Sequence, residues 1–271
     1  MSCSVTYCGH RIYVETAGEG ETVVFVHGWP TNGQLWGPQV EALRRSYRVV
    51  TFDGLGFGRS DKPRDHRYGF ESASEVLSAV VDAVLPEGEP LTLVAHDIGG
   101  PAAVLWAHAH RSRLRRLILL NAPLYPFSTP LDKVGRVSHR LPGVRTLSVT
   151  DFGLRSLMSA VGRNRSAAAR AHINNILATH RDWGSAVRLK TIVEPLQTDL
   201  FDTLEAKLLS FGGPTHLIIA RRDPLCYAHM RQLTERHPNL PARYLGDCGH
   251  FMAVDRPGEL SEALLKVLGE E

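Results

Sequence analysis

The sequence predicts an α/β protein with a mostly parallel sheet and helices on both faces. Short apolar runs, which are typical of strands buried on both sides, alternate with helical patterns along most of the chain. This alternation indicates consecutive strand–helix–strand units. The 271 residues, of which 43% are hydrophobic, are enough for one large core.

The first half of the chain supplies most of the predicted sheet. Residues 4–16 suit two short strands that turn at Gly9. Helices are predicted at 38–45, 71–85 and 101–106. Buried strands are predicted at 22–26, 47–52, 91–94 and 114–120.

The pattern changes between residues 124 and 213. This span shows no clear strand, and proline and glycine separate helical patterns at about 152–161, 166–180 and 199–210. Strands return at 215–220 and 242–245, and a closing helix follows at about 258–268. We therefore expect a core domain of residues 1–123 and 214–271. Residues 124–213 should form a helical cap, or lid, over the carboxyl ends of the strands, where ligands bind in such sheets.

Composition excludes several classes of function. The sequence has no run of about eighteen apolar residues and no pattern of a signal peptide. The net charge of +3 is too small and too dispersed to indicate nucleic-acid binding. The four cysteines show no metal-binding spacing, so we expect reduced thiols. We expect a cytoplasmic monomer or homodimer that acts on a small molecule, away from membranes, with no cofactor and no metal.

One stretch, 94–100, has the context of a nucleophile elbow. An apolar run ends in it and a small-residue helical pattern leaves it, which predicts a strand, a sharp turn and a helix. Ala95 and Gly99 supply the room that a strained residue at the tip needs. The tip is Asp97, and a carboxylate there can attack carbon directly and form an ester with the substrate. The alternative is an ordinary strand-to-helix connection with an acidic helix cap.

Two further residues are candidates to act with Asp97. Asp223 follows one predicted buried strand, and His250 follows the last one. The chain order nucleophile, acid, histidine recurs in a large class of hydrolases. Structural roles stay open for both residues, because His250 also suits a helix cap beside Asp255 and Asp223 also suits an ion pair with a neighbouring arginine.

Together these motifs resemble the α/β-hydrolase superfamily over nearly the whole chain. The match consists of the segment 27–30 (His-Gly-Trp-Pro), the glycine-rich loop 53–60, the elbow, and the segments 222–224 and 249–251. The resemblance implies an α/β-hydrolase fold. Its mostly parallel eight-stranded sheet would be flanked by helices, with a helical cap inserted after the sixth strand.

The aspartate at the elbow resembles the branch that holds epoxide hydrolases, haloalkane dehalogenases and haloacetate dehalogenases. In that branch the aspartate displaces a leaving group from carbon. A histidine, oriented by a second carboxylate, then activates water that hydrolyses the ester. The resemblance also implies a cis peptide before Pro30. The implied site consists of the catalytic residues Asp97, Asp223 and His250 and the oxyanion-hole residues Trp29 and Ile98.

The groups that would hold a leaving group differ from each pattern in this branch. Haloalkane dehalogenases use an asparagine after His-Gly and a tryptophan after the nucleophile, where this chain has Trp29 and Ile98. The arginines of haloacetate dehalogenases are missing from 98–103, and the lid tyrosines of epoxide hydrolases are missing from 126–225. The candidate substrate-binding residues are therefore Tyr125, Trp183 and Tyr227, with His139, His172 and His180 as substitutes in the lid.

The predicted function is that of an epoxide hydrolase-like enzyme, because His-Gly-x-Pro and the placement of Asp223 are nearest to that group. A haloalkane or haloacetate dehalogenase is the first alternative. A lyase or isomerase of small-molecule biosynthesis, with Asp97 or His250 as a base, is a second one. A third alternative is a ligand receptor with the same fold, in which Asp97, Asp223 and His250 have only a structural role. His27, Asp53 and His96 are expected to be structural.

Overall fold

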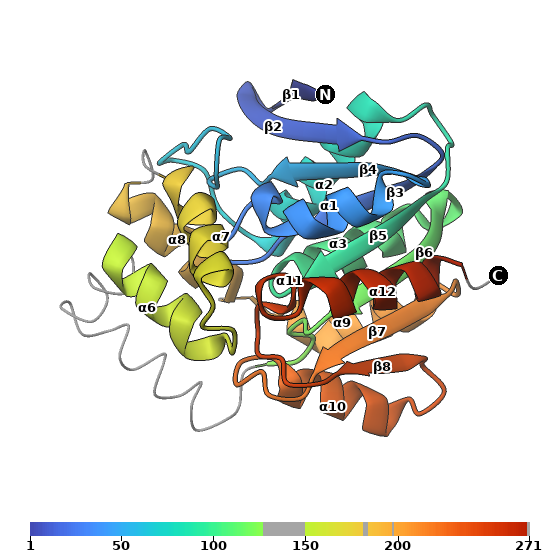
Figure 1. The fold of residues 1–271 in the computed structure, drawn as a ribbon. Helices are drawn as coiled ribbons and strands as arrows, with labels where there is room; N and C mark the ends of the chain where they lie inside the picture. Colours follow the sequence, from blue (N-terminus) through green and yellow to red (C-terminus); the bar gives the residue numbers. More distant parts are fainter. Residues whose placement is uncertain (127–149, 181–183, 197, 270–271) are drawn as a thin grey trace.

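An eight-stranded sheet runs through the molecule (Figure 1). The structure, a computed structural model, describes residues 1–126, 150–180, 184–196 and 198–269. The strands are β1 (Ser2–Tyr7), β2 (His10–Ala17), β3 (Glu21–Val26), β4 (Tyr47–Asp53), β5 (Leu91–His96), β6 (Leu114–Leu120), β7 (Thr215–Ala220) and β8 (Ala242–Leu245). Their order in the sheet is β1-β2-β4-β3-β5-β6-β7-β8.

The sheet is parallel from β4 to β8 and antiparallel at one edge. β1 and β2 form a hairpin, and β2 pairs antiparallel with β4. Cys8 and Gly9 have φ angles of 48° and 79°, as a tight two-residue hairpin turn requires. All six residues of β5 are buried, which explains why most of them are apolar. The predicted mostly parallel sheet is therefore confirmed.

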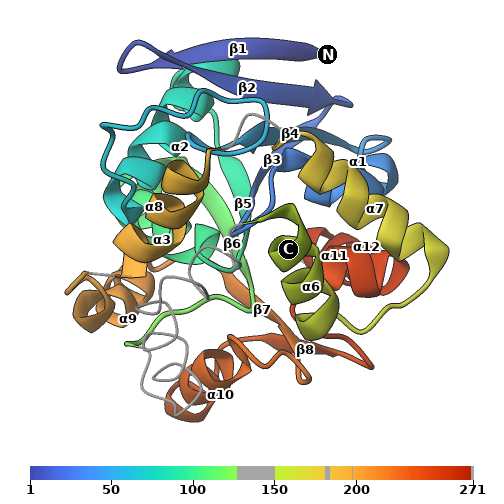
Figure 2. The same ribbon diagram turned by 90° about the vertical axis from the view of Figure 1, so that its left-hand side faces the viewer.

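Helices cover both faces of the sheet. The core helices are α1 (Gly37–Leu43), α2 (Phe70–Val84), α3 (Gly99–Ala109), α10 (Tyr227–Arg236), α11 (Met252–Asp255) and α12 (Pro257–Leu268), with 3₁₀ turns η1 (Gly33–Trp36) and η2 (Arg111–Arg113). Figures 1 and 2 show α1 and α12 on one face and α2 and α3 on the other. The two faces of the central strands are thereby removed from water.

The helical insertion between β6 and β7 is confirmed. It contains α6 (Asp151–Val161), α7 (Ala167–Ala178), α8 (Ser185–Leu196) and α9 (Phe201–Ser210). α6, α7 and α8 lie beyond the carboxyl ends of the central strands (Figure 1). α9 instead lies beside α3, and the ring of Phe201 packs edge-on against Phe70, with centroids 5.5 Å apart. The cap bounds of 124 and 213 stay a prediction.

Polar contacts join the lid to the core. The Asn32 amide donates to the carbonyl oxygen of Ile176 at the end of α7, over 3.0 Å. The Lys190 ammonium, on α8, donates to the carbonyl oxygens of Arg64 and His66 over 2.8 and 2.7 Å. Both lid helices are thus fixed to loops that follow core strands. Within the described part of the chain, no helix is both long and apolar enough to cross a membrane.

Candidate active site

Asp97 lies in the sharp turn between β5 and α3. Its φ of 51° is in the left-handed region, which aspartate and asparagine tolerate better than most residues. A side-chain carbon on Gly28 would lie 2.4 Å from the Cβ of Asp97, and one on Gly99 would lie 2.5 Å from the carbonyl oxygen of His27. Glycine at both positions therefore allows the elbow to approach the loop after β3.

The two oxygens of the Asp97 carboxylate have different surroundings. Oδ2 accepts a 2.9 Å hydrogen bond from the backbone N–H of Trp29, and the backbone N–H of Ile98 also donates to the carboxylate. Oδ1 lies 3.8 Å from His250 Nε2 and 3.8 Å from Cys226 Sγ. The peptide between Trp29 and Pro30 is cis, as the resemblance implied. The Trp29 N–H thus holds one oxygen, and the other oxygen faces the histidine.

His250 lies between the two carboxylates. Its Nδ1 lies 2.9 Å from Asp223 Oδ2, and because an ionised carboxylate only accepts, Nδ1 carries the proton. The Nε2 atom is buried and has no hydrogen-bond partner among residues 1–126, 150–180, 184–196 and 198–269. That nitrogen is therefore available to exchange a proton with substrate or water.

Asp223 is bound on both of its oxygens. Oδ1 accepts hydrogen bonds from the backbone N–H groups of Leu225 and Cys226, over 2.7 and 3.2 Å. Oδ2 accepts a 2.6 Å hydrogen bond from the Asn121 side-chain amide in addition to the one from His250. Asn121 and Asp223 are far apart along the chain, so no local motif predicts this role for Asn121.

Electrostatics keep this group of side chains charged. Burial lowers the pKa of His250, but attraction and hydrogen bonding by Asp223, together with the charge of Asp97, outweigh it and raise the pKa to about 9. Burial raises the pKa of Asp223, but the positive charge of His250 outweighs that effect and lowers it to about 2. Burial raises the pKa of Asp97. At neutral pH the site therefore holds a protonated His250 that is hydrogen-bonded to an ionised Asp223.

Three residues expected to be structural support the site. His27 Nδ1 donates to the carbonyl oxygen of Gly28 over 2.9 Å, and His27 Nε2 accepts from the backbone N–H of Gly54 over 2.9 Å. The carboxylate of Asp53 accepts from backbone N–H groups in two loops. His96 Nε2 lies 2.9 Å from the carbonyl oxygen of His250, to which it donates. Their predicted structural roles are confirmed.

Tyr125, a candidate substrate-binding residue, packs against α10. Its ring is stacked on that of His229, with centroids 6.3 Å apart. Burial raises the pKa of its phenol to about 12, and the charged groups that act on it are Glu205 and Arg236. These neighbours belong to α9 and α10 rather than to the elbow. Contact between Tyr125 and a substrate stays a prediction.

The remaining candidate substrate-binding residues are dispersed. Tyr227 begins α10, half-buried against the hydrophobic core. His172 lies 2.9 Å from a carbonyl oxygen of η1, and His180 is buried with Nδ1 2.9 Å from a carbonyl oxygen of α7. Trp183 and His139 lie outside the described residues. Of the predicted site, the structure brings together the catalytic and oxyanion-hole residues, and the substrate contacts stay a prediction.

Cys226 is a neighbour of the site that the sequence did not single out. It is buried, and its donor atom forms a group with those of Asp223 and His250 in which all lie within 4.8 Å of one another. Such a set resembles the ligands of a transition metal. Here, however, Asp223 already accepts hydrogen bonds on both oxygens, one of them from His250. The arrangement therefore suits a carboxylate that orients a histidine.

Asp255 joins the lid to the loop of His250. Its buried carboxylate accepts hydrogen bonds from the backbone N–H of Gly249 over 2.7 Å and from those of Arg163 and Asn164 over 2.9 and 3.0 Å. The backbone N–H of His250 itself donates to a lid carbonyl at the end of α6. The position of His250 is therefore set jointly by core and lid.

Comparison with known proteins agrees with this architecture. A cis-3-alkyl-4-alkyloxetan-2-one decarboxylase of Shewanella oneidensis is 27% identical over 266 residues, covering 93% of this chain and 83% of that protein. Haloalkane dehalogenase 2 of Mycobacterium bovis is 26% identical over 266 residues, covering 96% and 92%. An esterase from Exiguobacterium antarcticum has the same fold, with a TM-score of 0.84 over the whole of both chains at 21% identity.

The family itself follows from a match over most of the chain. The model of the alpha/beta hydrolase fold family matches residues 21–257. The expected fold class is confirmed, and a haloalkane dehalogenase is among the distant relatives, whereas the assignment to epoxide hydrolases stays a prediction. With its sheet, its helical insertion and the order of its motifs, the chain belongs to the alpha/beta hydrolase fold family.

Proposed function

We propose that the protein is a hydrolase that opens epoxides through an ester on Asp97. The observation that carries the proposal is that the two carboxylate oxygens have different surroundings. Oδ2 accepts a hydrogen bond from the Trp29 N–H, while Oδ1 faces His250. An ionised carboxylate attacks carbon without a base, so Oδ1 is the nucleophile.

Ring opening needs a proton for the oxygen that leaves carbon. Asp97 Oδ1 forms a bond to the ring carbon, and the carbon–oxygen bond breaks with its electron pair on the ring oxygen. His250 is protonated at neutral pH, because its pKa is raised to about 9, and supplies the proton directly or through one water. This source replaces the lid tyrosines that are missing from 126–225.

The second step returns both residues to their starting state. Neutral His250 takes a proton from water, and the hydroxide oxygen bonds to Cγ of the ester. Negative charge then grows on Oδ2, which already accepts a hydrogen bond from the Trp29 N–H, and the Ile98 N–H donates to the same carboxylate. Collapse expels the product with Oδ1 as its new hydroxyl oxygen. The proton of the new carboxyl group passes to that oxygen, so the diol leaves and Asp97 is ionised again.

A single turnover in ¹⁸O-labelled water tests the covalent step. The diol should contain no ¹⁸O after one turnover with excess enzyme, and the peptide that contains Asp97 should gain one ¹⁸O. If His250 instead activated water for direct attack on the epoxide, the first diol would carry the label and the proposal would be wrong. Matched bromoalkanes should react more slowly, because Ile98 offers no side-chain N–H donor for a halide.

A second candidate is the opening of a four-membered oxetan-2-one, as in the name of the Shewanella relative. The leaving group would be a carboxylate, a weak base that departs without a proton. Loss of carbon dioxide from the ring-opened ester would then form a carbon–carbon double bond and expel Asp97 as a carboxylate. Neither step uses water or an acid. This reaction therefore suits a chain that has no tyrosine between residues 126 and 225.

His250→Gln separates these two candidates. Epoxide hydrolysis needs His250 as an acid and then as a base, so the variant should lose diol formation and, without the acid for ring opening, should form no adduct on Asp97. Decarboxylation of a cis-3,4-dialkyl oxetan-2-one needs neither role and should continue in the variant. Alkene formation by the wild type that survives His250→Gln would favour the second candidate. Tight binding without turnover of either substrate would favour a receptor.

A further inference from the structure

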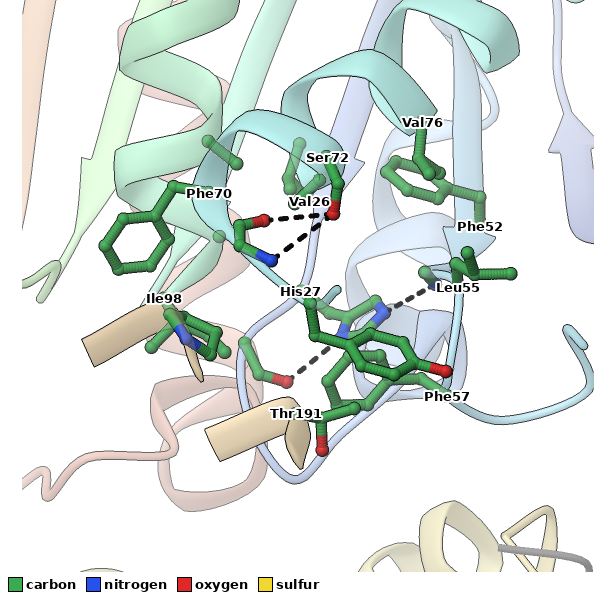
Figure 3. Close-up of a pocket in the computed structure, with 18 residues that line it drawn as sticks. Val26, His27, Phe52, Leu55, Phe57, Phe70, Ser72, Val76, Ile98 and Thr191 are labelled. Atoms are coloured by element: carbon green, nitrogen blue, oxygen red, sulfur yellow. Dashed lines mark hydrogen bonds between the residues drawn. The ribbon is translucent and has the colours of Figure 1, made fainter. Parts of the chain in front are cut away.

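An apolar pocket lies beside the elbow, where the core meets lid helix α8 (Figure 3). Its volume is about 70 Å³. Aromatic and aliphatic side chains from β4, the loop after it, α2 and the elbow form most of its wall. The main contributors are Phe52, Phe57, Tyr68, Phe70, Val76 and Ile98.

The polar groups in the wall are already hydrogen-bonded within the protein. Both nitrogens of His27 are paired with backbone groups, and Ser72 Oγ is paired with the backbone of Gly69, as Figure 3 shows. The Tyr68 hydroxyl donates to the carbonyl oxygen of Pro63 over 2.7 Å, and Thr191 Oγ1 donates to that of Arg188 over 2.8 Å. The donors of these side chains are thus already used within the protein and are not available to a polar ligand group, so the pocket suits hydrocarbon.

The pocket shares a wall with the Asp97 carboxylate. Gly28 lines the pocket, and a side-chain carbon built on it would lie 2.6 Å from Asp97 Oδ2. Ile98, the residue after the nucleophile, points its side chain into the same space (Figure 3). The pocket therefore lies directly beside the reacting carboxylate, with Gly28 and Ile98 at its near edge.

We propose that this pocket binds a short, unbranched hydrocarbon arm attached to the carbon that Asp97 attacks. The inference rests on the proposed function and adds the class of substrate: small-ring oxygen compounds that carry one short alkyl group. An apolar cavity of about 150 Å³ accommodates benzene, so about half that volume accommodates an arm of about three carbons. Binding would place the arm on one side of Asp97 and leave the other side to His250.

Equilibrium binding of linear primary alcohols tests the pocket without requiring any turnover. In an NMR titration of the ¹⁵N-labelled protein with ethanol through heptanol, affinity should rise about fourfold per methylene up to butanol. The three carbons of butanol farthest from the hydroxyl would fill the pocket. The carbon that bears the hydroxyl would take the position of the carbon that Asp97 attacks. Longer chains should bind no more tightly. The amides of Gly28 and Ile98 should shift.

Val76→Ala and Val80→Ala form a matched pair on α2. Both valines are buried, but only Val76 lines the pocket, so both variants lose similar packing and only one enlarges the site. Val76→Ala should extend the rise in affinity by about two carbons, the number of carbon atoms removed, and Val80→Ala should leave the profile unchanged. Ala73→Leu, at an exposed position in the pocket wall, should shorten the longest chain accepted without disturbing the core.

A parallel series of 1,2-epoxyalkanes separates this inference from the proposed function. The kcat/KM values should follow the alcohol profile, including the shift in Val76→Ala. If the alcohols bind as expected but no epoxide is turned over, the epoxide hydrolase proposal would be overturned and the pocket assignment would stand. Alcohol affinities that are the same in Val76→Ala and Val80→Ala, or that show no limit of chain length, would overturn the pocket assignment even if epoxides react.

Discussion

Asn121 and Asp223 are joined by a 2.6 Å hydrogen bond from the amide Nδ2 to carboxylate Oδ2, the same oxygen that holds Nδ1 of His250. Asn121 lies directly after β6, and Asp223 lies after the neighbouring strand β7. The Asn121 side chain also pairs with both backbone groups of Ala220 at the end of β7. Two adjacent strands thereby fix the direction in which the carboxylate, and through it the imidazole, points.

Asn121→Gly removes this link without straining the backbone, since φ at this position is 35°. We expect kcat to fall roughly 10- to 100-fold with little change in KM, because a hydrogen bond to a charged group contributes about 1.5–3 kcal/mol and Asn121 acts through Asp223. Steady-state kinetics with an epoxide would measure this. A rise in KM with unchanged kcat would show that Asn121 acts on binding rather than on orientation.

The pH dependence follows from the raised pKa of His250. Ring opening uses the protonated form, which persists up to about pH 9, so kcat/KM should fall as pH rises through that value. Esterification removes the charge of Asp97, one cause of the raised pKa, so His250 in the ester releases its proton at lower pH. If hydrolysis of the ester limits kcat, kcat should fall as the pH drops below the pKa of His250 in the ester, because the neutral imidazole activates the water.

Asp223→Asn provides the control for this assignment. Attraction and hydrogen bonding by Asp223 are the main causes that raise the pKa of His250, so the alkaline fall in kcat/KM should move to lower pH in the variant. Rate profiles from pH 6 to pH 10 in both proteins would measure the shift. An unchanged alkaline limb would assign it to a group other than His250.

The fold was largely predictable because burial on two faces leaves a plain pattern. Residues 23–26 of β3, 93–95 of β5 and 117–120 of β6 are apolar in the sequence and buried in the structure. Helix α8 was not predicted, because Pro195 in its last turn suggests a helix end. Helix α10 was missed since its buried face is small, and most of its residues are polar.

The site was predictable only where a residue type in a motif carries the chemistry. Asp97, Asp223 and His250 stand in segments with a recognisable order. Asn121 and Asp255 have ordinary local sequences, and their roles depend on partners that come close only when the chain folds. The apolar pocket was not predictable either, because its wall combines side chains from several separate elements.

Asp97→Asn and Asp97→Ala should separate chemistry from backbone strain. Both remove the nucleophile, and turnover should fall at least about 10⁴-fold. Asparagine tolerates the φ of 51°, so the Tm of Asp97→Asn should not fall, whereas alanine in this conformation costs about 1 kcal/mol. Calorimetry and epoxide kinetics on both variants check this. Substantial activity in a folded Asp97→Asn protein would exclude an ester on Asp97.

Asp255→Asn tests whether the lid and the His250 loop are held by one buried carboxylate. The variant replaces one acceptor oxygen by an amide that faces the N–H groups of Gly249, Arg163 and Asn164. At least one buried donor then loses its partner, so the free energy of unfolding should fall by about 2–3 kcal/mol. The kcat should fall as well, because Gly249 directly precedes His250.

Asp247→Asn is the matched control, because it also removes a carboxylate near the same loop. Asp247 is about half exposed and pairs with the arginines at 163, 222 and 256 at the surface. Exposed ion pairs contribute little, so its free energy of unfolding should change by less than about 1 kcal/mol. Urea unfolding of both variants gives the comparison. If both substitutions lower the free energy of unfolding equally, the net charge around the loop is what matters. The buried hydrogen bonds of Asp255 would then not be what holds the lid to the His250 loop.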